Sequence, residues 1–267
     1  MGRGEICPTL SEDALPFQHR RLKPLLNFPY YQIALPVLRR MNLARPSAFD
    51  YAAYWLQKMN VAVTGILDVG AFDGTMARHM ADLFPRAEIF AFEPSPESFA
   101  LLQATARRQP RIKPFALAIS DENGQTVLNV NRSPVTNSLL SVLDSPERDA
   151  VLGAGGETVK RVPCEMMRLD DFLQKHPDRR FQLLKTDAQG LDLRVLHGAE
   201  RALCDSIRAV IAEFHFFSVV YQGDTTYLEM MDEYLARLGF RLTAIPGISP
   251  NLATGRAFSA DGLWIRP

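Results

Sequence analysis

The residues of this chain that could do chemistry are acidic residues and glycines that follow short apolar segments. Asp68, Gly70 and Gly74 belong to the stretch Ile-Leu-Asp-Val-Gly-Ala-Phe-Asp-Gly at 66–74. Residues 66–69 predict a buried parallel strand, and Gly70 permits a sharp turn before a helix that begins at Gly74. A strand, a glycine turn and a helix N-terminus together form a site for a nucleotide-like ligand. The alternative is a turn of this kind that binds nothing.

A second carboxylate, Glu93, follows the next predicted strand at 88–92. In this position it can accept hydrogen bonds from both hydroxyls of an adenosine ribose. Alternatively, Glu93 is an acidic residue ahead of the helix that Ser95-Pro96-Glu97 would begin. The spacing Asp-x-Gly-x-x-x-Gly differs from the Gly-x-Gly-x-x-Gly of dinucleotide sites, which disfavours an NAD(P)-dependent oxidoreductase without excluding it.

Other polar residues stand at the ends of later predicted strands. Ligands of open α/β sheets bind outside the carboxyl ends of the strands, so residues far apart in sequence should form one neighbourhood. They are Asp68, Glu93, Ser120, Asp121, Asp187, Glu213 and His215. Acidic groups dominate this set, and the chain has no Gly-Lys-Ser/Thr phosphate loop. An acidic crevice suits a ligand with ribose hydroxyls and a positive centre, and S-adenosylmethionine has both.

Two of these residues are candidate general bases for a transfer reaction. His215 follows the predicted fifth strand, and histidine is a common base near neutral pH. Asp187 ends the predicted fourth strand and is the other candidate. Each could instead have a purely structural role. Asp187, Asp192 and Glu213 could together hold Mg²⁺, but we favour a site without metal.

The elements that must position these residues alternate between strands and helices, which predicts a doubly wound, mostly parallel sheet with helices on both faces. Hairpin-like strands at 127–130 and 159–166 interrupt the alternation, with a long loop at 131–156 between them. The predicted core strands are 66–69, 88–92, 112–119, 183–186, 209–213, 240–245 and 263–266. Later helices are expected at 168–175, around 193–203 and at 227–238.

Composition limits the class of protein. The chain has 267 residues, 47% of them hydrophobic, and its 30 basic and 30 acidic residues balance. We therefore expect no nucleic-acid partner. No apolar run is long enough to span a membrane, and the N-terminus has no apolar core of the signal-peptide type. The three cysteines are scattered, as expected of reduced thiols in a cytoplasmic protein. The oligomeric state stays open.

The motifs in combination resemble a known family. They are Ile-Leu-Asp-Val-Gly-Ala-Phe-Asp-Gly, Phe-Glu-Pro at 92–94, Arg-Leu-Asp-Asp-Phe at 168–172, Leu-Lys-Thr-Asp-Ala-Gln-Gly at 184–190, Val-Leu-His-Gly-Ala at 195–199, and Glu213 followed by Tyr-Gln-Gly at 221–223. In order and spacing they resemble the FkbM family of S-adenosylmethionine-dependent methyltransferases, over residues 60–267. Gln189 stands where many relatives carry Glu.

The resemblance implies a class I methyltransferase (Rossmann-like) fold, an α/β fold with a seven-stranded sheet whose last strand is antiparallel. It implies O-methylation of a hydroxyl on a small molecule, sugar or glycan. The cofactor site would include Asp68, Gly70, Ala71, Phe72, Gly74, Glu93 and Pro94, with Ser120 and Asp121 beside the adenine. A methyltransferase-fold protein without catalytic activity is a further alternative.

The chain is expected to divide near residue 60. Residues 61–267 would form the methyltransferase domain, and residues 1–60 an N-terminal helical extension that could act as a lid or acceptor-binding wall. Within this extension, Ser47 and Asp50 have the spacing of a capping box at the start of a helix.

Overall fold

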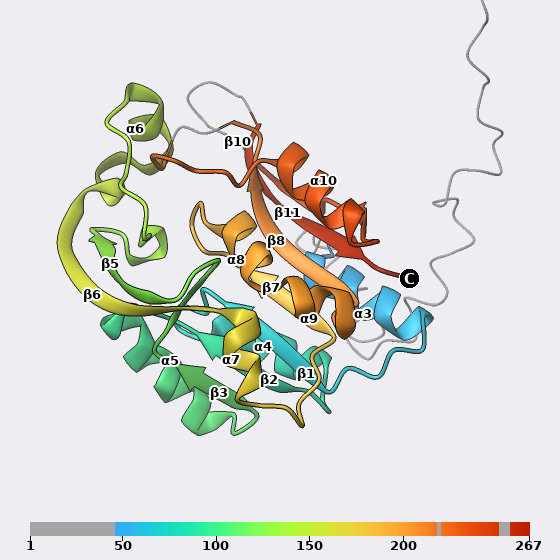
Figure 1. Cartoon of the computed structure of the whole chain (residues 1–267). Coiled ribbons are helices and arrows are strands. Elements are labelled where there is room, and N and C mark those ends of the chain that lie inside the picture. The colour runs from blue at the N-terminus through green and yellow to red at the C-terminus, as the bar shows by residue number, and fades with distance from the viewer. Residues whose placement is uncertain (1–45, 218–219, 251–256) are drawn as a thin grey trace, which may run out of the picture. The chain divides into compact units, whose positions relative to one another are not determined.

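The computed structural model describes residues 46–217, 220–250 and 257–267 (Figure 1). These residues belong to one compact unit that runs from Pro46 to Pro267. Its first helix is α3 (Ala48–Lys58), and Ser47 caps it in the predicted capping box with Asp50. The rest of the predicted N-terminal extension, residues 1–45, lies outside the described residues.

A large, mostly parallel sheet forms the centre of this unit (Figure 1). Its strand order is β10-β11-β8-β7-β1-β2-β3, and β9 also pairs with β11. The neighbours from β8 to β3 run parallel, whereas β11 is antiparallel to β8. The strands are β1 (Gly65–Val69), β2 (Glu88–Phe92), β3 (Ile112–Phe115), β7 (Leu183–Thr186), β8 (Ala209–His215), β9 (Arg241–Ala244), β10 (Ile248–Pro250) and β11 (Ala257–Ile265).

This topology is the class I methyltransferase arrangement, with the predicted antiparallel end. Eight strands stand where seven were expected, because β9 and β10 share one side of β11. Ala244 pairs with Leu263, and Ile248 pairs with Ala260 further along the same strand. The two short strands therefore occupy a single position in the sheet.

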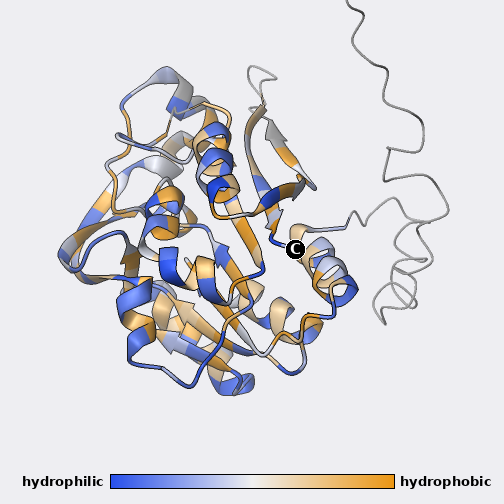
Figure 2. Cartoon of the chain, turned by 45° about the vertical axis from the view of Figure 1, so that its right-hand side comes forward, coloured by the Kyte–Doolittle hydropathy of each residue, from blue (hydrophilic) through white to orange (hydrophobic). Residues whose placement is uncertain are grey.

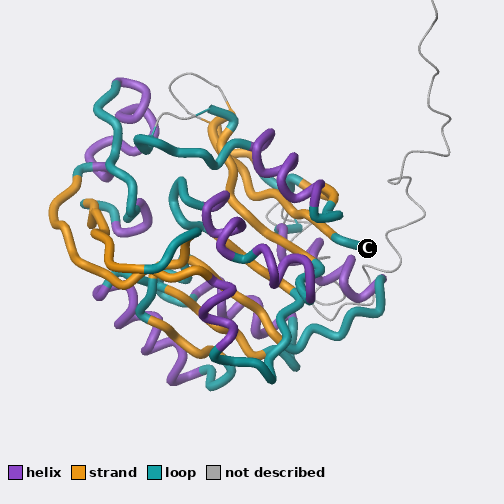
Figure 3. The backbone as a smooth tube through the Cα atoms, in the orientation of Figure 1, coloured by secondary structure: helices purple, strands orange, loops and turns teal. Residues whose placement is uncertain are grey.

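Helices cover both faces of the sheet (Figure 3). They are α4 (Thr75–Leu83), α5 (Pro96–Arg108), α7 (Leu169–Gln174), α8 (Asp192–Gly198), α9 (Glu200–Asp205) and α10 (Leu228–Arg237). Apolar residues of α7, α8, α9 and α10 form one buried cluster with every second residue of the central strands. Figure 2 shows the result, with apolar strands inside and polar residues on the outer surfaces of the helices.

The predicted single helix around 193–203 is two helices, because α8 ends at Gly198 and α9 begins at Glu200. The cause is a carboxylate distant in sequence. Asp170 accepts hydrogen bonds from the main-chain N–H of Arg201 at 2.9 Å and of Ala202 at 3.0 Å. A second helix N-terminus is thereby stabilised, since side-chain acceptors satisfy the free N–H groups of a first turn.

The predicted strand at 112–119 is also divided. Its first part is β3 in the main sheet, and its second part is β4 (Ala118–Ser120) in a separate three-stranded sheet of order β4-β6-β5. The predicted hairpin-like strands are β5 (Gly124–Asn131) and β6 (Thr158–Arg168), which pair antiparallel. The segment between them contains η4 (Pro134–Thr136), α6 (Pro146–Leu152) and η5 (Gly153–Gly156). This excursion provides the second wall of the cavity described below.

Candidate active site

The turn after β1 has the backbone that only glycine adopts easily. Gly70 has a φ of +69°, and a Cβ atom there would lie 1.9 Å from the main-chain oxygen of Asp187. The N–H groups of Gly70 and Ala71 both donate to the carbonyl of Phe92 at 3.0 Å. The turn therefore packs against the ends of β2 and β7, which a side chain at position 70 would prevent.

Glu93 holds this turn from the end of β2. Its carboxylate accepts hydrogen bonds from the main-chain N–H of Phe72 at 2.9 Å and of Ser95 at 2.8 Å. Burial raises the pKa of Glu93, and these two N–H donors oppose the rise. Each carboxylate oxygen can accept a further hydrogen bond. Glu93 therefore caps the chain before α5 and can still bind a ribose.

A cavity of about 400 Å³ opens at the carboxyl ends of β1, β2 and β7, a size in the usual range for small-molecule sites. One side is the turn after β1 with Glu93 and Pro94, and the other is the β5–η4 excursion. Most of its lining is apolar. The polar side chains that line it are Asp73, Thr75, Glu93, Asn137, Ser138, Lys185, Asp187 and Gln189.

Asp68 does not line the cavity and instead pairs with Lys185 on the neighbouring strand. The Lys185 Nζ atom lies 3.2 Å from Asp68 Oδ1, and it donates to the carbonyls of Gly70 at 2.8 Å and Val69 at 3.2 Å. Burial raises the pKa of Asp68, and the charge of Lys185 opposes this. The negative charges of Asp68 and Asp187 outweigh burial and raise the pKa of Lys185. Lys185 therefore stays charged and holds the turn.

Sequence reasoning did not single out Lys185 as a site residue. The available signal was a charged residue inside the apolar segment Leu-Leu-Lys-Thr. Such a residue in a buried parallel strand needs a partner of opposite charge.

Asp187, one of the two candidate bases, lines the cavity. Its side chain is 42% exposed and its Oδ2 atom lies 4.0 Å from the Lys185 Nζ atom. The main-chain N–H of Asp187 donates to Val69 O at 3.1 Å, which fixes the residue beside the turn after β1. Asp187 thus lies at the edge of the cavity, with the buried Lys185 cation beside it.

His215 is placed differently. It is buried, does not line the cavity, and its Nδ1 atom lies 2.6 Å from Asp224 Oδ2. Its Nε2 atom lies 3.9 Å from Glu213. Burial alone would lower the pKa of His215, but the hydrogen bond to Asp224 and the charge of Glu213 outweigh it, so the pKa is raised. The structure therefore pairs His215 with Asp224 rather than bringing it into the cavity with Asp187.

Glu213 and Asp192 lie near this pair and favour their protonated forms. Burial, together with the charge of Asp187, raises the pKa of Glu213 to about 8 and that of Asp192 to about 7. Asp192 also accepts hydrogen bonds from the Thr186 hydroxyl at 2.7 Å and from the Ala188 N–H at 3.0 Å. Sequence reasoning placed Glu213 among the strand-end residues and considered both carboxylates as metal ligands, but it did not predict their raised pKa values.

Among the described residues, no group of three or more His, Cys, Asp or Glu side chains has a geometry that could hold a metal ion. In the same part of the chain, no helix combines the length and apolar character needed to cross a membrane.

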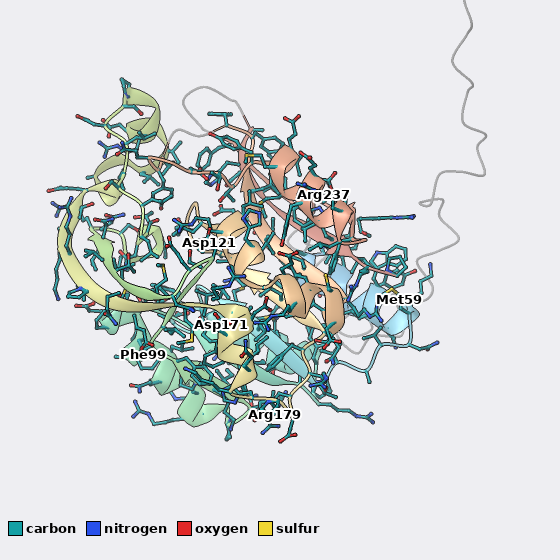
Figure 4. The ribbon with its side chains drawn as sticks, in the orientation of Figure 1. Met59, Phe99, Asp121, Asp171, Arg179 and Arg237 are labelled. Carbon is teal, nitrogen blue, oxygen red and sulfur yellow. The ribbon has the colours of Figure 1, made fainter. Side chains whose placement is uncertain are left out.

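Ser120 and Asp121 lie outside the cavity lining, whereas Leu117, Ala118 and Ile119 contribute to it. Asp121 accepts a hydrogen bond from Arg194 Nε at 2.7 Å and one from the Ser120 hydroxyl at 3.0 Å. It lies beside α8 (Figure 4). These two residues thus connect the excursion to α8, and the residues before them form the cavity wall.

Comparison with known proteins agrees with this geometry. A family model described as "Methyltransferase FkbM domain" matches residues 68–242, well over half of the chain. The chain is 26% identical to the 2-O-methyltransferase NoeI of Sinorhizobium fredii over 62% of this chain and 69% of that protein. It is 29% identical to the 31-O-demethyl-FK506 methyltransferase FkbM of Streptomyces tacrolimicus over 56% of this chain and 65% of that protein.

The hexuronic acid methyltransferase AglP of Haloferax volcanii is 28% identical over 55% of this chain and 54% of that protein. The chain thus spans between about half and about two thirds of the length of these relatives. Among solved structures, methyltransferase FkbM from Methylobacillus flagellatus aligns over 91% of this chain and 53% of that one, with 15% identity and a TM-score of 0.48.

Proposed function

The chain belongs to the methyltransferase FkbM family, and from this premise we propose that it transfers a methyl group from S-adenosylmethionine to a hydroxyl of a sugar or other small molecule. The observation that carries the proposal is the cavity beside the glycine turn. Glu93, after β2, and Asp187, after β7, line this cavity from the two sides of β1. The matching family is one of methyltransferases, so the family assignment does not support the alternative of an NAD(P)-dependent oxidoreductase. A non-catalytic protein of this fold remains the alternative that an activity assay must test.

The residues present fit the cofactor. Gly70, Ala71 and Phe72 line the cavity with the turn after β1, and Glu93 retains acceptor capacity for ribose hydroxyls. Leu117, Ala118 and Ile119 provide an apolar wall suited to an adenine ring. We therefore propose that Gly70, Ala71, Phe72, Glu93 and Pro94 hold the cofactor, whereas Asp68 acts on the turn through Lys185. Gly74, also expected at the cofactor site, lies outside the cavity lining and packs against α5.

S-adenosylmethionine supplies an electrophilic methyl group on a positively charged sulfur. The protein must place a hydroxyl oxygen in line with that methyl group and accept the hydroxyl proton as the new bond forms. Asp187 is the candidate for the proton, because its carboxylate lines the cavity and its side chain is 42% exposed. The same negative charge favours the positive sulfur. We keep the assignment of Asp187 as base for these reasons.

His215 remains a candidate in a second arrangement. Its hydrogen bond to Asp224 fixes the imidazole, and its Nε2 atom faces Glu213. In this arrangement the charge of His215 acts on the Glu213 carboxyl, and His215 does not touch the acceptor.

The names of the relatives suggest the class of acceptor. They include a 2-O-methyltransferase, a hexuronic acid methyltransferase and a methyltransferase of 31-O-demethyl-FK506. We propose a hydroxyl-bearing acceptor of sugar or polyketide type. We also place the reaction in the cytoplasm, because Cys164 and Cys204 are free thiols.

The test is methyl transfer from tritium-labelled S-adenosylmethionine to a panel of hexoses, hexuronic acids and macrolide alcohols. The proposal expects label in at least one acceptor. Asp187→Ala should retain affinity for S-adenosylhomocysteine, which has no positive sulfur, and lose about 10²–10⁴-fold in kcat. If the wild type binds the cofactor but transfers label to no acceptor, the non-catalytic alternative is favoured. If Asp187→Ala keeps full activity, Asp187 is not the base.

A further inference from the structure

Gln189, two residues beyond Asp187, has a backbone conformation that needs an explanation. Its φ is +52°, a left-handed value that residues other than glycine rarely adopt. The next residue, Gly190, has a φ of +93°. Such conformations persist where surrounding contacts impose them, and they concentrate at functional sites. Three hydrogen bonds hold Gln189, one through its carbonyl and two through its side-chain amide.

The side-chain amide of Gln189 joins Asp187 to Tyr221. Its Nε2 atom donates to Asp187 Oδ1 at 2.6 Å, and its Oε1 atom accepts from the Tyr221 hydroxyl at 2.8 Å. The opposite amide orientation would place two acceptors, Gln189 Oε1 and Asp187 Oδ1, against each other. The Asp187 carboxylate therefore selects the orientation with Nε2 toward Oδ1, and this orientation leaves Oε1 beside the Tyr221 hydroxyl.

Tyr221 is a rigid support for this amide. It is 2% exposed, and its hydroxyl also lies 3.0 Å from the carbonyl of Thr136 in η4. A Cβ atom at Gly190 would lie 3.1 Å from the Tyr221 ring, so the ring packs directly on the turn after Gln189. The Ser138 hydroxyl completes the contact by donating to Gln189 O at 2.7 Å. The β5–η4 excursion, the turn after β7 and the segment after β8 thus meet at one amide.

We infer that Gln189 and Tyr221 are positioning residues, which hold one oxygen of the Asp187 carboxylate so that the other faces the acceptor in the cavity. The inference rests on the proposed function for its catalytic meaning. Asp187 Oδ1 accepts the hydrogen bond from Gln189, whereas Asp187 Oδ2 lies 4.0 Å from Lys185 Nζ. The Asp187 side chain is 42% exposed. A donor to Oδ1 also stabilises the ionised carboxylate, which is the form that accepts a proton.

Several charged groups surround Asp187, so the inference must be tested by differences between variants. Lys185 faces it from β7 and Asp68 from β1, while Asp192, Glu213 and Asp261 contribute negative charge from α8, β8 and β11. His215 is paired with Asp224. These groups are the same in wild type and in variants of Gln189 or Tyr221, so their effects cancel in the comparison.

The experiment follows the Asp187 carboxyl directly by NMR of protein labelled with ¹³C in aspartate carboxyls, with the signal assigned by its loss in Asp187→Asn. Gln189→Met removes the donor and should move the pH midpoint of this signal upward, a tenfold or larger change in proton affinity. Gln189→Glu should move it further, because two carboxylates then share one proton. Tyr221→Phe, which frees the amide to turn, should move it in the same direction.

The matched control is Tyr234→Phe, whose hydroxyl donates to Leu196 O at 3.4 Å outside the cavity lining. It should leave the midpoint unchanged. Unchanged midpoints in Gln189→Met and Gln189→Glu would overturn the positioning role, even if Tyr221→Phe failed to fold. A calorimetric titration of S-adenosylhomocysteine separates the two proposals. Wild-type protein that does not bind it would overturn the proposed function, whereas normal binding with unchanged midpoints would overturn the positioning role alone.

Discussion

Lys185 and Asp68 form a buried ion pair across two parallel strands, with 3.2 Å between Lys185 Nζ and Asp68 Oδ1. The side chains are 7% and 0% exposed. They are register partners in β7 and β1, so both point to the same face of the sheet. The same Nζ atom binds the carbonyls of Val69 and Gly70. One cation thus connects the sheet to the turn that is proposed to hold the cofactor.

This pair predicts the effect of removing its cation. Lys185→Met should lower the free energy of unfolding by about 3–5 kcal/mol, because it leaves the Asp68 carboxylate buried without a partner. Adding Asp68→Asn should recover part of the loss. Lys160→Met is the control, since its ion pair with Glu97 is exposed and should contribute at most about 1 kcal/mol. Urea unfolding measures all three, and equal small losses at the two lysines would contradict the account.

A second prediction concerns the glycine turn. Gly70→Ala places a Cβ atom 1.9 Å from the Asp187 carbonyl at a φ of +69°. Gly223→Ala is a matched control with a φ of +76° and nothing within 4 Å of the added atom. Gly223→Ala should cost about 1 kcal/mol of backbone strain, and Gly70→Ala should cost several times more and weaken cofactor binding. Similar melting temperatures for the two variants would show that the turn tolerates a side chain.

Glu93 should contribute both to the affinity for the cofactor and to the stability of the turn after β1. Glu93→Gln removes the charge that would accept the ribose hydroxyls, so the Kd for S-adenosylhomocysteine should rise about tenfold or more. The loss of one acceptor for the N–H of Phe72 or Ser95 should also lower stability by about 1–2 kcal/mol. Glu97→Gln, an exposed acid in the first turn of α5, is the control for calorimetry. An unchanged Kd would leave Glu93 with its capping role alone.

The raised pKa of Glu213 predicts how stability varies with pH. It rises from 4.5 to about 8, so the folded state binds this proton more tightly than the unfolded state. The resulting stabilisation is fully present below about pH 4.5 and is lost as the pH rises through about 8. Wild-type protein should lose about 1.4 kcal/mol of stability per pH unit across this window relative to Glu213→Gln, on the order of 5 kcal/mol in all. Urea unfolding at several pH values measures this, with the exposed Glu229→Gln as control; parallel curves for wild type and Glu213→Gln would contradict it.

Local patterns predicted the fold well because its strands are short, apolar and separated by clear turn residues. The strand at Leu183–Thr186 and the capping box of Ser47 and Asp50 were predicted as they occur. The helix break after Gly198 was missed because the group that causes it, Asp170, lies in another helix.

The candidate site was only partly predictable for the same physical reason. The order of strands in the sheet brings Lys185 to Asp68, and the segment that follows β8 brings Asp224 to His215. His215 looked like a cavity residue from its place after the predicted strand at 209–213, but it is the last residue of β8 and is buried against Asp224. The positions of Gly70, Glu93 and Asp187 followed from the strand ends alone.

The central claim is that this cavity binds the methyl donor of a methyltransferase. The most direct measurement is a calorimetric titration of the full chain with S-adenosylhomocysteine and, separately, with NAD. The account predicts micromolar binding of S-adenosylhomocysteine, weakened by Gly70→Ala but not by Gly223→Ala, and no binding of NAD. Binding of NAD without any response to S-adenosylhomocysteine would contradict it.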